Sequence, residues 1–171
     1  VASWEDYLEG AGDKTAPLLT APLEGVATMA LHGNAAATIG NCFRALGNAY
    51  QIGNDILNFS GGDGANTSGS DLRRRAPNGV IVLFRATLDD QQRADFDLWY
   101  ANGSDDGFEI WLTAVLHSSA LGDAAMRMNA LMVRAEAYAD TLPSELTDVI
   151  APIQQLLQQV CVKSVASLNQ A

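Results

Sequence analysis

Three polar side chains stand out in the apolar stretch "ALGNAYQIGNDILNF", residues 45–59. Asn54, Asp55 and Asn58 are spaced so that a helix would place all three on one face. Gln51, one turn earlier, extends that face. Amide and carboxylate oxygens in this arrangement suit Mg²⁺, a hard cation. The alternative is a helix C-terminus at which Asn and Asp satisfy backbone carbonyls and water, and spacing alone leaves both interpretations open.

Helices must position these side chains, because apolar residues recur at helical spacing and no stretch alternates with period two. The motif falls on a long predicted helix at residues 33–59. Further helices are predicted at 3–12, 13–31, 80–86, 87–103, 104–122, 123–142 and 144–168. Gly10 and Gly12 are expected to end the first of these. The glycine-rich, polar segment 60–79 is predicted to be a long loop. The 171 residues are therefore expected to form a single all-α domain, 1–171.

Composition restricts the class of protein. The net charge of −10 disfavours binding to nucleic acid and to anionic membranes. No charge-free apolar run approaches twenty residues, so no transmembrane segment is expected. No basic-then-apolar leader opens the chain, which favours a cytoplasmic location. Val1 stands first in place of Met, which leaves processing, trimming or a longer parent protein open.

The remaining reactive side chains suggest no second site. Cys42 and Cys161 lie in apolar helical patterns and are expected to be buried free thiols. His32 and His117 have no neighbours at zinc-ligand spacing. The tryptophans fit helix packing better than a stacking platform.

Four segments, in order, resemble the trans-isoprenyl diphosphate synthases. "YQIGNDILNF" is similar to their second aspartate-rich motif, F-Q-x-x-D-D-x-x-D. "EDYLEGAGDKTAPLL" resembles their Y-x-x-x-x-x-x-K-T segment, and "GSDLRRRAPNGVIVLF" resembles G-x-D-L-R-E-G-K-x-T-L-P. "AEAYADTLPSELTDVIAPI" looks like their C-terminal A-x-x-x-L-x-x-L-P run. The resemblance extends over nearly the whole chain but covers only the C-terminal half of that family's helical bundle.

The resemblance implies roles for particular residues. Catalytic roles would fall to Lys14, Thr15, Gln51 and Asp55. Diphosphate would be bound by Lys14, Thr15, Arg73, Arg74 and Arg75, and Mg²⁺ by Asn54, Asp55, Asn58 and Asp71. In this family Mg²⁺ joins the allylic diphosphate to two aspartate-rich motifs and neutralises the leaving group.

The departures from the family pattern fall on the charged positions. Asn54 and Asn58 stand where the motif has Asp, and each keeps an oxygen but loses a negative charge. Two unit charges 4 Å apart interact by about 4 kcal/mol at an effective dielectric near 20, so a weakened Mg²⁺ site is expected. Ala76 replaces a lysine, and Ala65-Asn66 replace a Gly-Lys pair. The arginines at 73–75 either restore some of that positive charge or form a solvated loop run.

Two other motif matches are weaker. Asp105-Asp106-x-x-Glu109 has the spacing of an aspartate-rich motif but follows the second motif, so these acids are expected at a helix N-terminus. The start of the class I terpene cyclase motif, N-D-x-x-S, also resembles residues 54–58. Gly62 stands where that motif needs a Glu, which disfavours cyclisation.

Half of a helical bundle would leave part of its core uncovered, so a partner is expected. This partner is a missing N-terminal half, a second polypeptide or a second copy, in a homo- or hetero-oligomer. Three functions remain open. The first is part of a prenyltransferase that condenses an allylic diphosphate with isopentenyl diphosphate in isoprenoid biosynthesis. The others are a non-catalytic paralogue or subunit that stabilises an active synthase, and an isoprenoid-binding module.

Overall fold

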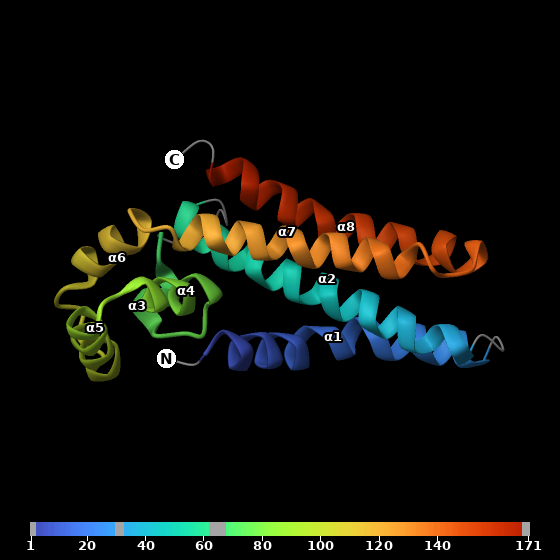
Figure 1. Cartoon of the computed structure of the whole chain (residues 1–171), viewed down its shortest axis with the longest axis horizontal. Coiled ribbons are helices and arrows are strands. Elements are labelled where there is room, and N and C mark those ends of the chain that lie inside the picture. Colours follow the sequence, from blue (N-terminus) through green and yellow to red (C-terminus); the bar gives the residue numbers. More distant parts are fainter. Residues whose placement is uncertain (1–2, 30–32, 62–67, 169–171) are drawn as a thin grey trace.

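The computed structural model describes residues 3–29, 33–61 and 68–168, with the side chains of 13–19, 26–27 and 33–34 left out. All regular structure in these ranges is helical, which confirms the predicted all-α class (Figure 1). The helices are α1 (Trp4–Met29), α2 (Gly33–Ser60), α3 (Ser70–Arg74), α4 (Gly79–Thr87), α5 (Asp90–Asn102), α6 (Phe108–Leu116), α7 (Ala120–Ala139) and α8 (Ser144–Leu168).

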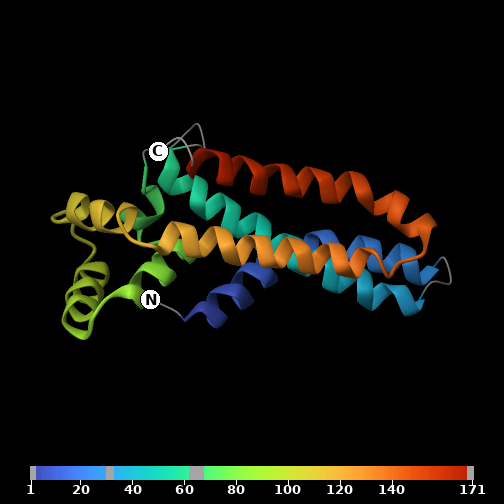
Figure 2. The same cartoon turned by 45° about the horizontal axis from the view of Figure 1, so that its top comes forward.

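Four long helices and four short ones occupy different parts of the molecule. Helices α1, α2, α7 and α8 run along the long axis, and α3 to α6 gather at one end (Figures 1 and 2). Helix α2 is central, because it packs against α1, α7 and α8. The motif-bearing end of α2 therefore lies where the long helices meet the short ones.

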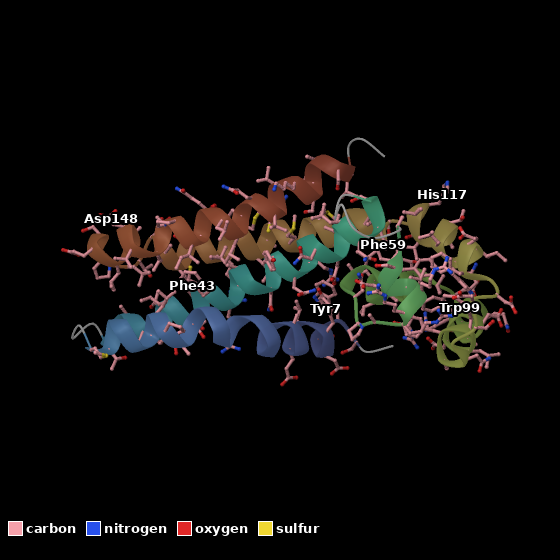
Figure 3. All side chains as sticks on the ribbon, turned by 180° about the vertical axis from the view of Figure 1, so that it is seen from behind. Tyr7, Phe43, Phe59, Trp99, His117 and Asp148 are labelled. Carbon is pink, nitrogen blue, oxygen red and sulfur yellow. The ribbon has the colours of Figure 1, made fainter. Side chains whose placement is uncertain are left out.

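The apolar core follows the same division. Phe84, Phe96 and Trp111 form edge-on aromatic contacts at the short-helix end, where the Phe96 and Trp111 ring centroids are 5.1 Å apart. Trp99 also packs there, as predicted. Phe43 of α2 is fully buried in a second cluster, farther along the long helices (Figure 3).

The sequence wrongly predicted a break in the first helix. Gly10 and Gly12 were expected to end a helix, but α1 continues unbroken through both. A Cβ atom at Gly12 would lie 3.4 Å from the Asn48 side chain of α2. That distance is ordinary van der Waals contact, so the approach of the two helices does not itself require glycine here. The packing of α1 against α2 outweighs the low helix propensity of glycine.

The predicted loop at 60–79 is shorter than expected, because Ser70–Arg74 form helix α3 and Gly79 begins α4. The Ala65-Asn66 pair and His32 lie outside the described residues. Cys42 and Cys161 are buried free thiols, as predicted. Within the described ranges, no helix has the length and apolar character needed to cross a membrane.

Candidate functional site

Helix α2 places Asp55 at a buried junction with α1 and α4, where its side chain is 2% exposed. Its Oδ2 accepts a hydrogen bond from the Tyr7 hydroxyl and another from the Gly79 backbone N–H, both at 2.6 Å. Its Oδ1 accepts a hydrogen bond from Nε2 of Gln51 at 3.0 Å. Both carboxylate oxygens thus have partners within the protein, drawn from three helices.

Burial dominates the electrostatics of this junction. It raises the pKa of Asp55 from 3.8 to about 6, although the hydrogen bonds from Gly79, Tyr7 and Gln51 oppose the rise and the charge of Asp71 adds to it. Burial and the neighbouring Asp55 carboxylate raise the pKa of the Tyr7 phenol far above its ordinary value. Tyr7 therefore remains a hydrogen-bond donor to Asp55.

Asn58 makes a second junction, between α2 and the start of α3, and is 6% exposed. Its Nδ2 donates to the Ser70 hydroxyl at 2.7 Å. Its Oδ1 accepts from the Asp71 backbone N–H at 3.1 Å. Asn54, another member of the predicted metal-binding group, is half-buried. The spacing predicted that Asn54, Asp55 and Asn58 would share one face of α2. Of the three, Asp55 and Asn58 are shown in contact with neighbouring helices.

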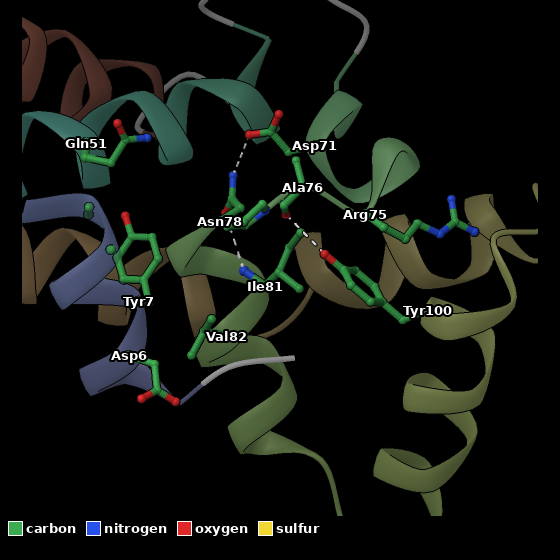
Figure 4. Close-up of a pocket in the computed structure, with 13 residues that line it drawn as sticks. Asp6, Tyr7, Gln51, Asp71, Arg75, Ala76, Asn78, Ile81, Val82 and Tyr100 are labelled. Carbon is green, nitrogen blue, oxygen red and sulfur yellow. Dashed lines mark hydrogen bonds between the residues drawn. The ribbon is translucent and has the colours of Figure 1, made fainter. Parts of the chain in front are cut away.

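A pocket of about 610 Å³ lies beside the two junctions, and we call it the α1–α4 pocket (Figure 4). Its polar lining includes Asp6, Tyr7, Gln51, Asp71, Asn78 and Tyr100. Ile81 and Val82 of α4 supply part of its apolar wall. Of the residues predicted from sequence, the pocket brings together Gln51, Asp71 and Arg75. Lys14 and Thr15 belong to α1, but their side chains lie outside the described part of the chain.

Hydrogen bonds hold the pocket wall in place. Oδ2 of Asp71 accepts from Nδ2 of Asn78 at 3.0 Å. Oδ1 of Asn78 accepts from the Val80 backbone N–H at 2.9 Å and so caps the N-terminus of α4. The Tyr100 hydroxyl donates to the Ala76 carbonyl oxygen at 3.1 Å, and burial raises the pKa of Tyr100 to about 12. Tyr100 is therefore a neutral donor at ordinary pH.

The arginine run mainly attaches α3 to the turn between α5 and α6. Arg73 pairs with Asp105 at 3.0 Å and with Glu109 at 3.7 Å, and its guanidinium lies 3.9 Å from the Phe108 ring centroid. The acidic side chains of residues 105–109 were expected at the N-terminus of a helix. They lie at the start of α6, where two of them pair with Arg73. Arg74 is exposed.

Arg75 takes part in the same attachment. It donates to the backbone carbonyl oxygens of Arg73 and Ser104, and its guanidinium lies 4.2 Å from the Trp99 ring centroid. In Figure 4 its side chain extends away from Tyr7 and Gln51. Its φ of 56° lies in the left-handed region, at the position where the family pattern has glycine.

These residues do not by themselves fit a Mg²⁺ ion. Among the residues that the structure describes, no group of three or more His, Cys, Asp or Glu side chains could hold a metal. Asp55 is the one carboxylate left in the motif, and donors from three helices already contact its oxygens. A cation there would have to displace at least part of this hydrogen bonding.

Sequence reasoning did not single out Tyr7, Asn78 or Tyr100. Two of them carried a usable signal. Tyr7 is the tyrosine of the Y-x-x-x-x-x-x-K-T-like segment, and Asn78-Gly79 is an N-cap pattern before an apolar helix. Tyr100 carried no such signal, because its role depends on how α5 packs beside residues 76–78.

Known proteins resemble this chain in sequence and in fold. A sequence profile described as polyprenyl synthetase matches residues 1–115. Among curated protein sequences, none matches the chain significantly. A polyprenyl synthase from Roseobacter denitrificans has a similar solved structure, with a TM-score of 0.74 and 23% identity over 99% of this chain and 54% of that one.

A decaprenyl diphosphate synthase from Rhodobacter capsulatus gives a TM-score of 0.70 and 21% identity, over 96% of this chain and 50% of that one. The chain therefore spans about half the length of these solved structures. Their likeness supports the bundle architecture, and the profile match covers well over half of the chain. The protein belongs to the polyprenyl synthetase family, the trans-isoprenyl diphosphate synthases that its motifs resemble.

Proposed function

We propose that this chain supplies the C-terminal half of a prenyltransferase site, which condenses an allylic diphosphate with isopentenyl diphosphate in isoprenoid biosynthesis. The observation that supports this proposal is the α1–α4 pocket. Three of its lining residues, Tyr7, Gln51 and Asp71, come from three different segments that resemble family motifs. The fold brings these segments to one cavity, as a shared substrate site requires.

Diphosphate binding is assigned to α1 in this proposal. Lys14 and Thr15 would contact the allylic diphosphate, as the resemblance implies, because a lysine provides the compact positive charge that a phosphate needs. Arg73 and Arg75 contribute less, since their guanidinium groups contact Asp105 and the Ser104 carbonyl oxygen. The family is generally Mg²⁺-dependent. The residues described here do not complete a metal site, so the metal-binding carboxylates of an active assembly would belong to the complementary half of the fold.

The chain is proposed to form one all-α domain, 1–171, that packs against that complementary half. Apolar side chains on the outer surfaces of α7 and α8 remain uncovered: Met126, Val133, Val149 and Leu156 are 58% to 65% exposed. The partner is an N-terminal segment of the same protein, a second polypeptide or a second copy. A cytoplasmic location remains a prediction, to be checked by cell fractionation.

A second candidate function is a non-catalytic subunit that stabilises an active synthase. Two observations favour it: Asn stands at two Asp positions of the motif, and the remaining carboxylate, Asp55, is engaged within the protein. The pocket also suits the third candidate, an isoprenoid-binding module, but no observation favours that function over the other two.

One reconstitution experiment separates the candidates. The chain is mixed with the complementary half, Mg²⁺, an allylic diphosphate and radiolabelled isopentenyl diphosphate, and the prenyl product is measured. Product that requires the chain and falls at least 10-fold in Lys14→Ala supports the enzyme. Asp140→Asn, at the exposed end of α7, is the matched control. Product that requires the chain but is unchanged in both Lys14→Ala and Asp71→Asn indicates a stabilising subunit, and product independent of the chain refutes both functions.

A further inference from the structure

We propose that Asp55 and Asn58 are positioning residues in this protein: they hold Tyr7, Gln51 and Asp71 in the wall of the α1–α4 pocket and do not gather a divalent cation. This inference concerns the motif alone. It stands whether the assembled protein is an enzyme or a subunit.

The contacts of Asp55 are those of a side chain that orients its neighbours. One carboxylate oxygen accepts a hydrogen bond from Tyr7 and the other accepts one from Gln51. Both of these residues line the pocket. Asp55 itself is buried behind them. Figure 4 shows Tyr7 and Gln51 on the same side of the pocket, where they come from α1 and α2. One carboxylate thus sets the positions of two pocket side chains from different helices.

The third donor ties this carboxylate to α4. Gly79 is the first residue of α4, so its N–H group has no hydrogen-bond acceptor within the helix. Asp55 provides that acceptor. A carboxylate at a helix N-terminus also interacts favourably with the helix dipole. A Cβ atom at Gly79 would lie 2.9 Å from the Tyr7 ring, so the close approach of α4 to Tyr7 requires glycine. Asp55, Tyr7 and Gly79 therefore form one tightly packed unit.

Asn58 acts on the part of the pocket lining that Asp71 and Asn78 form. It accepts from the Asp71 backbone N–H, and the Asp71 side chain then accepts from Asn78, the cap of α4. The pocket residues Asp71 and Asn78 are thereby connected to α2 through Asn58.

The amide at position 58 is explained by this role. The amide donates to the Ser70 hydroxyl and accepts from the Asp71 N–H, but an ionised carboxylate could accept from both groups, because a hydroxyl also donates. The difference between Asn and Asp at this position therefore lies in charge. An aspartate here would also be buried close to Asp71, and no arginine or lysine is paired with this junction in the described ranges. Asn in place of the motif's Asp at position 58 weakens a metal site. The same change suits a buried junction that carries no compensating positive charge.

The first test measures metal binding by the full chain without substrate. Mn²⁺ affinity, read by electron paramagnetic resonance, is expected to be unchanged in Asp55→Asn. Asn58→Asp is expected to lower the melting temperature both with and without Mg²⁺. A loss of Mn²⁺ affinity of 10-fold or more in Asp55→Asn would overturn the proposal, and so would a Mg²⁺-dependent rise in melting temperature in Asn58→Asp.

The second test measures positioning directly. The NMR signals of ring-labelled Tyr7 are expected to shift in Asp55→Asn and to stay unchanged in Asp97→Asn. This control removes a carboxylate of α5 that pairs with Arg85, in the last turn of α4. Tyr7→Phe keeps the Asp55 carboxylate, so it covers the case in which Asp55→Asn does not fold. Its melting temperature is expected to fall while Mn²⁺ affinity stays the same, and an unchanged melting temperature would contradict the proposal. Neither readout involves prenyl transfer, so failure here is distinguishable from failure of the proposed function.

Discussion

The buried carboxyl group of Asp55 is expected to make the protein more stable as the pH falls from 7 to 5. Burial raises its pKa in the folded protein to about 6, against 3.8 for the ordinary group. A group whose pKa is raised on folding binds its proton more tightly in the native state. Its contribution is therefore complete below the unfolded pKa and is lost as the pH rises through the folded pKa.

The size of the effect follows from the shift. A difference of about 2 pKa units corresponds to about 3 kcal/mol at low pH, since each unit is worth about 1.4 kcal/mol. Between pH 7 and pH 5 the linkage relation predicts a gain of about 1.4 kcal/mol in the free energy of unfolding. Asp6 and Asp97 have lowered pKa values, so their stabilisation is lost at lower pH, below their ordinary value of 3.8.

Urea unfolding at pH 5, 6 and 7 measures this gain for the wild-type protein and for Asp55→Asn. The variant is expected to be less stable at pH 7, because an amide cannot accept all three hydrogen bonds, and to lack the gain at pH 5. Asp140→Asn, an exposed control, should follow the wild-type curve. Equal pH dependence in the wild type and in Asp55→Asn would refute the argument.

Three further changes probe the supports of the site by urea unfolding. Arg75→Gly should be about 1 kcal/mol more stable than Arg75→Ala, because a φ of 56° suits glycine; the reverse order would contradict the backbone argument. Asn78→Ala should cost about 1–2 kcal/mol through loss of the α4 cap, whereas Asn129→Ala, exposed on α7, should cost nothing; equal effects would argue against the cap. Phe96→Ala should cost about 3–5 kcal/mol, because this ring is fully buried, and a cost under about 1 kcal/mol would show that the aromatic cluster is not packed as described.

The local pattern of residues was enough to predict most of the helices, although it missed α3 and the continuity of α1. Apolar spacing marked the helix that carries residues 54–58, and the i, i+1, i+4 spacing predicted that Asn54, Asp55 and Asn58 would share a face of it. Asp55 and Asn58 are both buried against neighbouring helices, whereas Asn54 is only half-buried. The predicted break at Gly10 and Gly12 failed for a physical reason. Glycine is a weak helix former when taken alone, but packing against α2 stabilises a continuous α1.

Residue types could suggest which side chains are suited to binding a metal ion. They could not show which other groups of the protein would contact those side chains. A carboxylate such as that of Asp55 is a common cation ligand. Its hydrogen-bond donors here include Tyr7, 48 positions away, and the Gly79 N–H, 24 positions away. The same limit applies to Arg73, whose charge meets Asp105 from 32 positions along the chain. Local sequence determined the helices and their polar faces, because these depend on near neighbours. Tertiary packing decided whether a polar side chain meets solvent, a ligand or another helix, because that depends on segments distant in the chain.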